Sequence, residues 1–523
     1  RHFAMRRFHA CETCTRSGNG FGAPMTQSGK ILSTQKLVIL GLMLWPLPTA
    51  WGQPLNDVHS RLNLTQVAEV RRPKSAEEVA EFVKEAKAQG WKASIAGARH
   101  AMGGQQFGTD AHHLDMTGMN RMLALDADRG IARVEAGITW PVLLQALEAA
   151  QSGREDLWTF RQKQTGADVL TLGGAVSANI HGRGLMMKPF VDDIESLTIV
   201  DATGELRKLS RELEPEWFSL VVGGYGLFGV VTEMELRLTR RQKVQRIVEI
   251  GTVTGLPGRI AERVREGFVL GDFQFSPDTQ SPDLLKEGVF SCYRPVTVET
   301  SLPGNPAALN PAAWRQLLSW AHSDMAKGWA AYKTHYQRTN GQVYWSDRAQ
   351  MSHYDTNYEE LLEAGLPQLE PGSLMISELY VPRERLEDFL TACAADFREH
   401  QTRVIYGTVR FIQKDNVSFL AWARQDFACI VFNLRVTHTE AGKEKAQEDF
   451  RRLIDRALQR GGSFFLTYHR WASRAQLLKA YPQFPEFLNK KLKYDPEELF
   501  QSDWYRHWKG KLKADESPAP VKP

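Results

Sequence analysis

Three glycine-rich segments carry the residues whose types and spacing could do chemistry. The first is IAGARHAMGG, residues 95–104, and a strand-like run, WKASI, leads into it. Glycine lets the backbone approach a ligand closely, and a loop entered from a strand tip can aim consecutive N–H groups at a phosphate. Arg99 adds a fixed positive charge and His100 a nucleophilic imidazole. Taken alone, this loop would be read first as a surface turn that carries a solvated histidine, and the further glycine-rich segments change that reading.

The second and third segments repeat this pattern further along the chain. TLGGAVSANIHGRG (171–184) joins glycines to polar side chains, and VVGGYGLFGVV (221–231) contains Gly223, Gly224, Gly226 and Gly229. Three such segments, separated by strand-like runs, indicate one extended ligand that bears phosphate. None fits the GxGxxG dinucleotide fingerprint with its later acid, and no GK[ST] P-loop is present in the sequence, which disfavours a conventional nicotinamide or ATP site.

A β-α-β unit positions the first segment. VAEV (67–70) predicts a strand, Ser75 and Glu78 predict a capping box at the start of a helix, and Gly90 fits its C-cap. WKASI (91–95) predicts the second strand. Further strands are expected at 112–116 and 131–136, followed by a helix that Thr139 caps, with Pro141 in its first turn.

Composition places the chain among ordinary globular proteins. It has 523 residues, of which 42% are hydrophobic and 24% charged, which predicts two or three domains. A formal charge of +4, with scattered basic residues, argues against nucleic acid or an acidic polymer as a partner. Cys11 and Cys14 form a lone CxxC, which is a weak metal signal, and no metal site is predicted. Cys292, Cys393 and Cys429 indicate no disulfide framework.

The two ends of the chain are expected to lie outside the fold. Residues 25–52 contain a charged region, the apolar run LVILGLMLWPLP and a small-x-small site, which predict a secretory signal peptide and an exported, periplasmic or extracellular protein. The alternative is an uncleaved N-terminal segment that anchors the protein to a membrane. Residues 1–24 are expected to be translated upstream sequence, and 513–523 a disordered tail.

Residues 66–241 resemble the FAD-binding domain of the vanillyl-alcohol oxidase superfamily, also called the p-cresol methylhydroxylase (PCMH) type. The three glycine-rich segments occur in that family's order. The chain is most similar to the aldonolactone and alditol oxidases and to the decaprenylphosphoryl-ribose oxidase branch. This resemblance implies an α+β fold, in which an FAD-binding domain of two α/β subdomains is joined to a cap domain with an antiparallel sheet flanked by helices.

The resemblance also implies how FAD is held. The first segment would hold the pyrophosphate, the second would run along the flavin and the third would approach the adenine. His100 matches the histidine bonded to the flavin 8α-methyl in covalent members, although Ala101 follows it where the family commonly has Ser. The implied cofactor-binding residues are Ala96, Gly97, Ala98, Arg99, His100, Ala101, Gly103, Gly104, Thr171, Gly173, Gly174, Ser177, Asn179, His181, Gly226, Gly229 and Val230.

Residues 242–465 resemble the cap, or substrate, domain of sugar-lactone and alditol oxidases. The stretches 374–382, 403–415, 418–424 and 428–436 predict an antiparallel sheet with one polar face, and helices are expected at 383–399 and 440–459. In the related enzymes a strand that bears an Arg lies over the flavin, and Arg410 matches it. Their acidic residue two positions earlier is Thr408 here. The alternative for Arg410 is a structural ion pair with Asp415 or Asp426.

Residues 466–512 resemble the family's C-terminal return to the flavin domain. Tyr468, His469 and Arg470 stand where the related groups have a Lys. One of them could orient substrate, accept its proton or stabilise charge at flavin N1. The alternative is that all three are surface polar residues.

Two functions follow from this resemblance. The first is an FAD-dependent oxidoreductase that oxidises the CH–OH group of a sugar-like, polyol, lactone or related small alcohol, with oxygen or another acceptor reoxidising the flavin. The second is a flavin-binding protein of the same fold that has lost its catalytic set and acts as an accessory protein. The absent Lys and the presence of Thr408 in place of an acid keep the second reading open.

Overall fold

The computed structural model describes residues 52–352 and 358–513. The predicted upstream segment 1–24, nearly all of the predicted signal peptide 25–52, the Cys11–Cys14 pair and nearly all of the predicted tail 513–523 lie outside the described residues. Within the described ranges, no helix has the length and apolar character needed to span a membrane. Helices and sheets are both present, and the predicted α+β class is confirmed.

A three-stranded parallel sheet positions the first glycine-rich segment. Its order is β3 (Glu69–Arg71), β5 (His112–Asp115), β4 (Ala93–Ala96), and α1 (Ala76–Gln89) connects β3 to β4. A separate pair, β1 (Gln53–Leu55) and β2 (Thr65–Val67), precedes it. Ser75 Oγ accepts the N–H of Glu78, but the Glu78 carboxylate accepts the N–H of Lys74, so the predicted capping box does not close.

A six-stranded antiparallel sheet follows, and β11 is its longest strand. The order is β10-β9-β11-β7-β6, with β8 also paired to β11. The bounds are β6 (Met122–Asp126), β7 (Ile131–Glu135), β8 (Trp158–Phe160), β9 (Ile194–Val200), β10 (Leu206–Ser210) and β11 (Val230–Arg240). Helices α2 (Trp140–Ala150), α3 (Leu172–Ala178) and α4 (Pro215–Val221) connect these strands.

An eight-stranded antiparallel sheet forms the second large unit, in the order β15-β12-β14-β13-β17-β18-β16-β19. Its strands are β12 (Lys243–Thr252), β13 (Leu270–Phe275), β14 (Glu287–Val296), β15 (Val343–Trp345), β16 (Gly372–Pro382), β17 (Val404–Ile412), β18 (Phe427–Thr437) and β19 (Ser463–Phe464). The helices of this unit are α5 (Leu256–Arg265), α6 (Pro311–Ser323), α7 (Met325–Arg338), α8 (Tyr358–Gly365), α9 (Leu386–Glu399) and α10 (Glu440–Gln459).

The predicted strand at 418–424 is wrong. The Asp415 carboxylate accepts the N–H groups of Val417 and Ser418, which folds the segment between β17 and β18 into turns. The helix predicted at 440–459 is present with those bounds, and strands occupy most of the other three predicted stretches.

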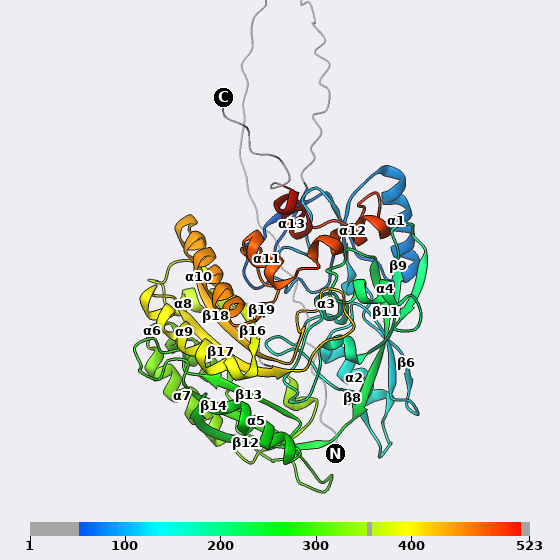
Figure 1. The fold of residues 1–523 in the computed structure, drawn as a ribbon. Helices are drawn as coiled ribbons and strands as arrows, with labels where there is room; N and C mark the ends of the chain where they lie inside the picture. Colours follow the sequence, from blue (N-terminus) through cyan, green and yellow to red (C-terminus); the bar gives the residue numbers. More distant parts are fainter. Residues whose placement is uncertain (1–51, 353–357, 514–523) are drawn as a thin grey trace, which may run out of the picture. The chain divides into compact units, whose positions relative to one another are not determined.

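Helices cover the two faces of this sheet differently. Helix α10 contacts β16, β18 and β19, and α9 contacts β16 (Figure 1). On that face Phe397 packs against Phe432, with ring centroids 5.2 Å apart. Residues of α6 and α7 line a cavity with side chains of the opposite face. Because strand side chains alternate between faces, every second residue of β16, β17 and β18 is available to that cavity.

The C-terminal helices adjoin the first sheet. They are α11 (Arg474–Ala480), α12 (Phe484–Tyr494) and α13 (Asp503–Lys513). The N–H of Ala93 donates to Leu499 O, and the N–H of Gln501 donates to Ala93 O, each at 2.7 Å. Residues near 500 therefore extend the edge of β4.

Along the chain, β11 is the last strand of the six-stranded sheet and β12 is the first strand of the eight-stranded sheet. The domain bounds 66–241, 242–465 and 466–512 stay predictions.

Candidate functional site

One cleft brings the three glycine-rich segments together with the large antiparallel sheet. Residues predicted for cofactor binding or catalysis line it from every one of these parts: Ala96, Gly97, Ala98, Arg99, His100, Ala101, Thr171, Gly173, Gly174, Ser177, His181, Gly226, Gly229, Arg410 and Tyr468. These segments are far apart in the sequence, so their convergence is a property of the fold.

The first segment presents unused backbone donors to this cleft. Arg99 has a φ of 58°, in the left-handed region, where the chain turns out of β4. Among the residues that the structure describes, the N–H groups of Ala98, Arg99, Ala101 and Met102 have no hydrogen-bond acceptor. Four such donors beside a cleft fit an anionic ligand, such as the pyrophosphate of FAD.

The glycines of the first two segments have two different roles. A Cβ on Gly97 would lie 1.9 Å from Thr171 Oγ1, and one on Gly173 would lie 2.9 Å from Ala136 Cβ. Those two glycines are needed for packing within the protein. A Cβ on Gly174 would meet only Thr171 Oγ1, at 3.2 Å, and would otherwise occupy the cleft. Space that a methyl group would fill therefore fits a flat cofactor lying against this segment.

The segment around Gly174, predicted as a loop, is a helix. Thr171 caps α3 by accepting the N–H of Gly174 at its Oγ1, and Asn179 ends the helix with a φ of 47°. Small residues on the exposed face of this short helix allow a ligand to approach its backbone closely. The same close approach was expected of a loop.

Gly174→Val should give soluble protein that lacks most of its flavin. The valine side chain has room in the cleft itself but fills the space where the cofactor would lie. Flavin content per mole of purified protein, measured by absorbance, checks this expectation. Gly173→Val is the matched comparison, since its side chain collides with Ala136 and should compromise folding. Gly174→Val protein with a full complement of flavin would contradict the assignment.

Four residues assigned to the cofactor lie away from the cleft. Gly103 donates its N–H to Thr467 O at 3.1 Å, and Gly104 lies against Asn63 and Arg470. Asn179 is buried: its amide donates to Asp415, and its Oδ1 accepts the N–H of Val191. Val230 is buried in the core next to β9, and its neighbour Val231 lines the cleft instead.

Two of the three C-terminal candidates also lie away from the cleft. His469 is 3% exposed and packs against Phe450 and Trp471, and burial lowers its pKa to about 3. Arg470 reaches Asn63 Oδ1 at 3.4 Å. Tyr468 lines the cleft, and burial raises its pKa well above the ordinary value. Its phenol therefore stays protonated at neutral pH, so no phenolate is present to act as a base, and its O–H can donate a hydrogen bond.

His100 lies beside the imidazole of His59, for which no sequence motif predicts a role. Its Nδ1 is 3.0 Å from His59 Nε2, and both side chains line the cleft. Burial, followed by the charges of His59 and Arg99, lowers the pKa of His100 to about 3. Burial lowers the pKa of His59 to about 4. Both rings are neutral at neutral pH, so His100 retains a nucleophilic nitrogen.

Arg410 projects from β17 without the ion pair that was its structural alternative. It is 7% exposed, and its guanidinium donates to Thr165 Oγ1. Asp415 is bound by Asn179 and Ser418, while Asp426 pairs with Arg383. Arg410 Nε has no partner among the described residues.

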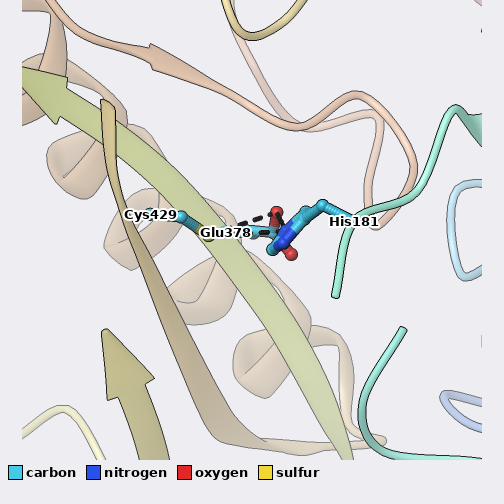
Figure 2. A group of neighbouring side chains, drawn as sticks. All are labelled: His181, Glu378 and Cys429. Atoms are coloured by element: carbon cyan, nitrogen blue, oxygen red, sulfur yellow. Dashed lines mark hydrogen bonds and ion pairs between the residues drawn. The ribbon is translucent and has the colours of Figure 1, made fainter. Parts of the chain in front are cut away.

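Glu378 is a buried carboxylate on β16 that the predictions missed. It is 4% exposed, and its Oε1 lies 2.7 Å from His181 Nε2 and 2.5 Å from Tyr380 Oη. Cys429 on β18 completes the group. Its Sγ lies 3.5 Å from His181 Nε2 and 3.5 Å from Glu378 Oε1. Figure 2 shows the three side chains His181, Glu378 and Cys429 directed toward one another from a loop and two strands.

Hydrogen bonds keep this carboxylate ionised. Burial by itself would raise the pKa of Glu378, but the charge and hydrogen bond of His181, the Tyr380 hydroxyl and the charge of Arg410 together lower it. Burial raises the pKa of the Cys429 thiol well above its ordinary value, so Cys429 is a neutral neighbour. The site thus holds an anionic base next to an imidazole.

A second cavity of about 940 Å³ opens from the same place. It is walled by the free face of the large sheet and by α6 and α7. Its lining shares with the cleft the residues His59, Met102, Thr165, Gly166, Ile376, Glu378, Arg410 and Tyr468. A ligand in the cleft and a second molecule in the cavity would therefore meet at Glu378, Arg410 and Tyr468.

Of the residues that the predictions missed, Glu378 could have been found from the sequence. Glu378 is the one charged residue in the apolar alternation LMISELYVP, which marks a polar position on a strand otherwise suited to the core. Thr165 and His59 lie in irregular stretches where no pattern indicates a role.

Residues 67–210 match a protein family described as the FAD binding domain. The match contains the first and second glycine-rich segments and α3. These residues are an FAD-binding domain, so the predicted cofactor and the resemblance to PCMH-type proteins are confirmed.

Similarity to individual proteins is limited in extent. The chain is 29% identical over 167 residues to an uncharacterized oxidoreductase of the fasciation locus of Rhodococcoides fascians, covering 32% of this chain and 36% of the relative. It is 26% identical over 135 residues to the mitochondrial L-galactono-1,4-lactone dehydrogenase of Brassica oleracea, covering 26% and 21%. It is 28% identical over 159 residues to decaprenylphosphoryl-beta-D-ribose oxidase of Mycolicibacterium smegmatis, covering 29% and 33%. The matches thus span 21% to 36% of the length of these relatives.

Proposed function

We propose that this chain, whose residues 67–210 are an FAD-binding domain of the PCMH type, is an FAD-dependent oxidoreductase that acts on a CH–OH group. The substrate is a small alcohol of the sugar-like, polyol or lactone class, and oxygen or another acceptor takes the electrons. The observation that carries this proposal is the shared lining of the two cavities, where Glu378, Arg410 and Tyr468 lie together. The limited similarity to lactone dehydrogenases and a sugar oxidase supports the same class.

The protein's own residues divide the work as follows. FAD, bound along the glycine-rich segments, supplies a hydride acceptor. Glu378 is the anionic group that both cavities share, so it accepts the proton of the substrate hydroxyl. His181 and Tyr380 fix the Glu378 carboxylate through hydrogen bonds at 2.7 and 2.5 Å. This role replaces the proton acceptor expected at Tyr468 or His469, because Tyr468 stays protonated and His469 is buried away from the cleft.

Two further groups hold the substrate oxygen. Arg410 has an unpartnered Nε and a guanidinium anchored by Thr165, so it can donate to a hydroxyl or carbonyl. Tyr468 also lines the shared region and can donate its phenolic O–H to the substrate oxygen. The buried sheet face, with Ile376 beside Glu378, limits the access of water to the reacting carbon.

A substrate screen under anaerobic conditions tests the proposal. Purified yellow protein should lose its flavin absorbance on addition of at least one sugar, sugar alcohol or aldonolactone. If none of these classes, nor a phenolic alcohol, bleaches a flavin that dithionite does bleach, the protein is not an oxidoreductase of this class and an accessory role gains support. Reoxidation by air or by an added quinone then separates oxidase from dehydrogenase.

His100→Ala should release a flavin that the native protein holds covalently. This expectation rests on the neutral, nucleophilic imidazole of His100, which lines the cleft beside the unused N–H groups of the first segment. Acid-precipitated native protein should show yellow fluorescence after denaturing electrophoresis, and the variant should not. His112→Ala is the control, since His112 stacks on Trp91 at 3.9 Å outside the cleft. Complete loss of flavin from native protein into the acid supernatant would contradict the covalent bond.

We also propose that the protein is exported. The support is the sequence pattern of residues 25–52. Cell fractionation with an epitope at the C-terminus tests this location, and recovery in the cytosolic fraction alone would contradict it.

A further inference from the structure

Two buried arginines, Arg183 and Arg246, line the large cavity but not the cleft. Arg246 on β12 pairs in register with Tyr293 on β14, and Asp272 on β13 pairs with Ser291 on β14. Side chains at these positions project from one face of the sheet. Arg183 joins them from the loop that follows His181. All of these except Ser291 line the cavity.

Neither arginine has a carboxylate partner at ion-pair distance among the described residues. Arg183 is 9% exposed and Arg246 is 8% exposed. Arg246 Nε donates to Ser291 Oγ at 2.9 Å, and Arg183 donates to Ala349 O. Arg183 Nε has no hydrogen-bond partner within the described part of the chain. Two guanidinium charges are therefore held in a shielded place by neutral groups.

Aromatic rings and one acid compensate only part of this charge. The guanidinium carbon of Arg183 lies 5.1 Å from the Tyr293 ring centroid, and that of Arg246 lies 5.3 Å from it and 4.5 Å from the Tyr336 ring centroid. Asp272 is 4% exposed, and its Oδ1 has no hydrogen-bond partner in residues 52–352 and 358–513. It lies near enough to raise the pKa of both arginines. Two positive charges and one negative charge leave one positive charge uncompensated.

We propose that Arg183 and Arg246 form a binding site for an anionic oxygen group of the substrate, a carboxylate or a phosphate. A buried charge without a partner is costly, and a ligand anion would supply that partner. The planar guanidinium matches the geometry of carboxylate and phosphate oxygens. This inference rests on the proposed function, and it narrows the substrate to an alcohol that carries an anionic group on the part remote from the reacting carbon.

The arrangement separates two tasks within one cavity. Glu378 and Arg410 lie where the cavity meets the cleft, whereas Arg183, Arg246 and Tyr293 line the cavity but not the cleft. An anchored anion would therefore orient the substrate without approaching the site of proton removal. Glu378 is itself negative, and this separation avoids repulsion between the two anions.

Binding to the oxidised holoenzyme tests this site without requiring turnover. The probes are phenyl phosphate and benzoate, with benzyl alcohol as the neutral comparison, and the readouts are calorimetry and the change in flavin absorbance. We expect at least one anion to bind the native protein, and the stronger of the two identifies the anionic group. Arg246→Met and Arg183→Met should each weaken that binding about ten- to hundredfold, the range expected for loss of a hydrogen bond to a charged group. Benzyl alcohol should bind all three proteins alike.

Two further variants keep the test decisive. Arg246→Lys retains the charge and should bind the anion with intermediate affinity, even where Arg246→Met folds poorly. Arg61→Met is the matched control, because Arg61 lines the same cavity but pairs with Glu360 at 2.8 Å in a partly exposed position. It should leave anion binding unchanged. Absence of anion binding to native protein, or equal binding by every variant, would overturn the anion site. Anion binding without any substrate oxidation would overturn the proposed function alone.

Discussion

Glu378→Gln is expected to slow anaerobic reduction of the bound flavin by about 10²- to 10⁴-fold, the usual contribution of a positioned general base. Glutamine has nearly the same shape and can keep a hydrogen bond to His181, but its amide cannot accept the proton of a substrate hydroxyl. Glu378 lines both cavities and is held by Tyr380 as well. The variant should therefore retain its flavin. Stopped-flow absorbance with the substrate found in the screen measures the rate.

Glu359→Gln separates a chemical effect from a structural one. Glu359 also lines the large cavity and is buried, but it pairs with Arg435 at 3.0 Å away from the cleft. Its replacement should lower the melting temperature because it breaks a buried ion pair. It should leave the rate of flavin reduction almost unchanged. If Glu378→Gln reduced its flavin at the native rate, Glu378 would not be the proton acceptor.

The pH dependence of the rate identifies the base independently. A base acts in its deprotonated form, so the rate falls as the pH drops through the pKa of that base. The His181 and Tyr380 hydrogen bonds and the Arg410 charge outweigh the effect of burial and lower the pKa of Glu378, which places the fall below the ordinary range of a glutamate, about 4.3. The rate should therefore be flat from neutral pH to about pH 5. A fall centred near 6.5, the ordinary pKa of histidine, would instead point to an imidazole as the acceptor.

The glycine pattern predicted the cofactor cleft but not the role of each glycine. Gly97, Gly173 and Gly174 have the same signature in the sequence, since each adjoins other small residues. In the structure all three glycines line the cleft, but side chains of Thr171 and Ala136 occupy the space beside the first two, whereas a Cβ on Gly174 would meet only Thr171 Oγ1. Which side of a glycine is filled depends on contacts between segments that are distant in the chain, and local spacing does not encode them.

The catalytic candidates were predictable only in part for the same reason. Alternation in residues 374–382 and 403–415 predicted two strands, and it placed Arg410 on the face opposite Val409. The pairing of β16 with β18, and of β18 with β17, brings Glu378 within the influence of Arg410. That register is a long-range property.

Residues 242–360 gave the weakest prediction and contain much of the large cavity. Strand β12 has no clear alternation of burial in its second half, where most residues are only partly covered. Helices α6 and α7 bury only His322 and Gly328 fully, because their aromatic side chains face a cavity. Prediction from hydrophobic periodicity assumes that the apolar face of an element packs against a filled core. It therefore misses elements that line a cavity. Arg183 and Arg246 became candidates only when those elements were placed.

Arg410→Met should keep its flavin and a melting temperature within a few degrees of the native protein, while flavin reduction slows at least about tenfold and up to about 10³-fold. The side chain is 7% exposed, its Nε has no partner among the described residues, and it lines both cavities. Methionine fills a similar volume without the charge. A donor aimed at the substrate oxygen stabilises charge that develops during the reaction, so its loss affects the rate more than the fold.

Arg383→Met is the matched control for this result. Arg383 is another arginine of the same sheet region, and it pairs at 3.5 Å with Asp426, the acid that was the alternative partner for Arg410. A partly exposed pair of this kind contributes little, so the control should change neither rate nor stability appreciably. Arg410→Lys should recover part of the lost rate, because a lysine retains the charge but not the planar donor geometry. A native rate in Arg410→Met would assign Arg410 to the structural support of Thr165 alone.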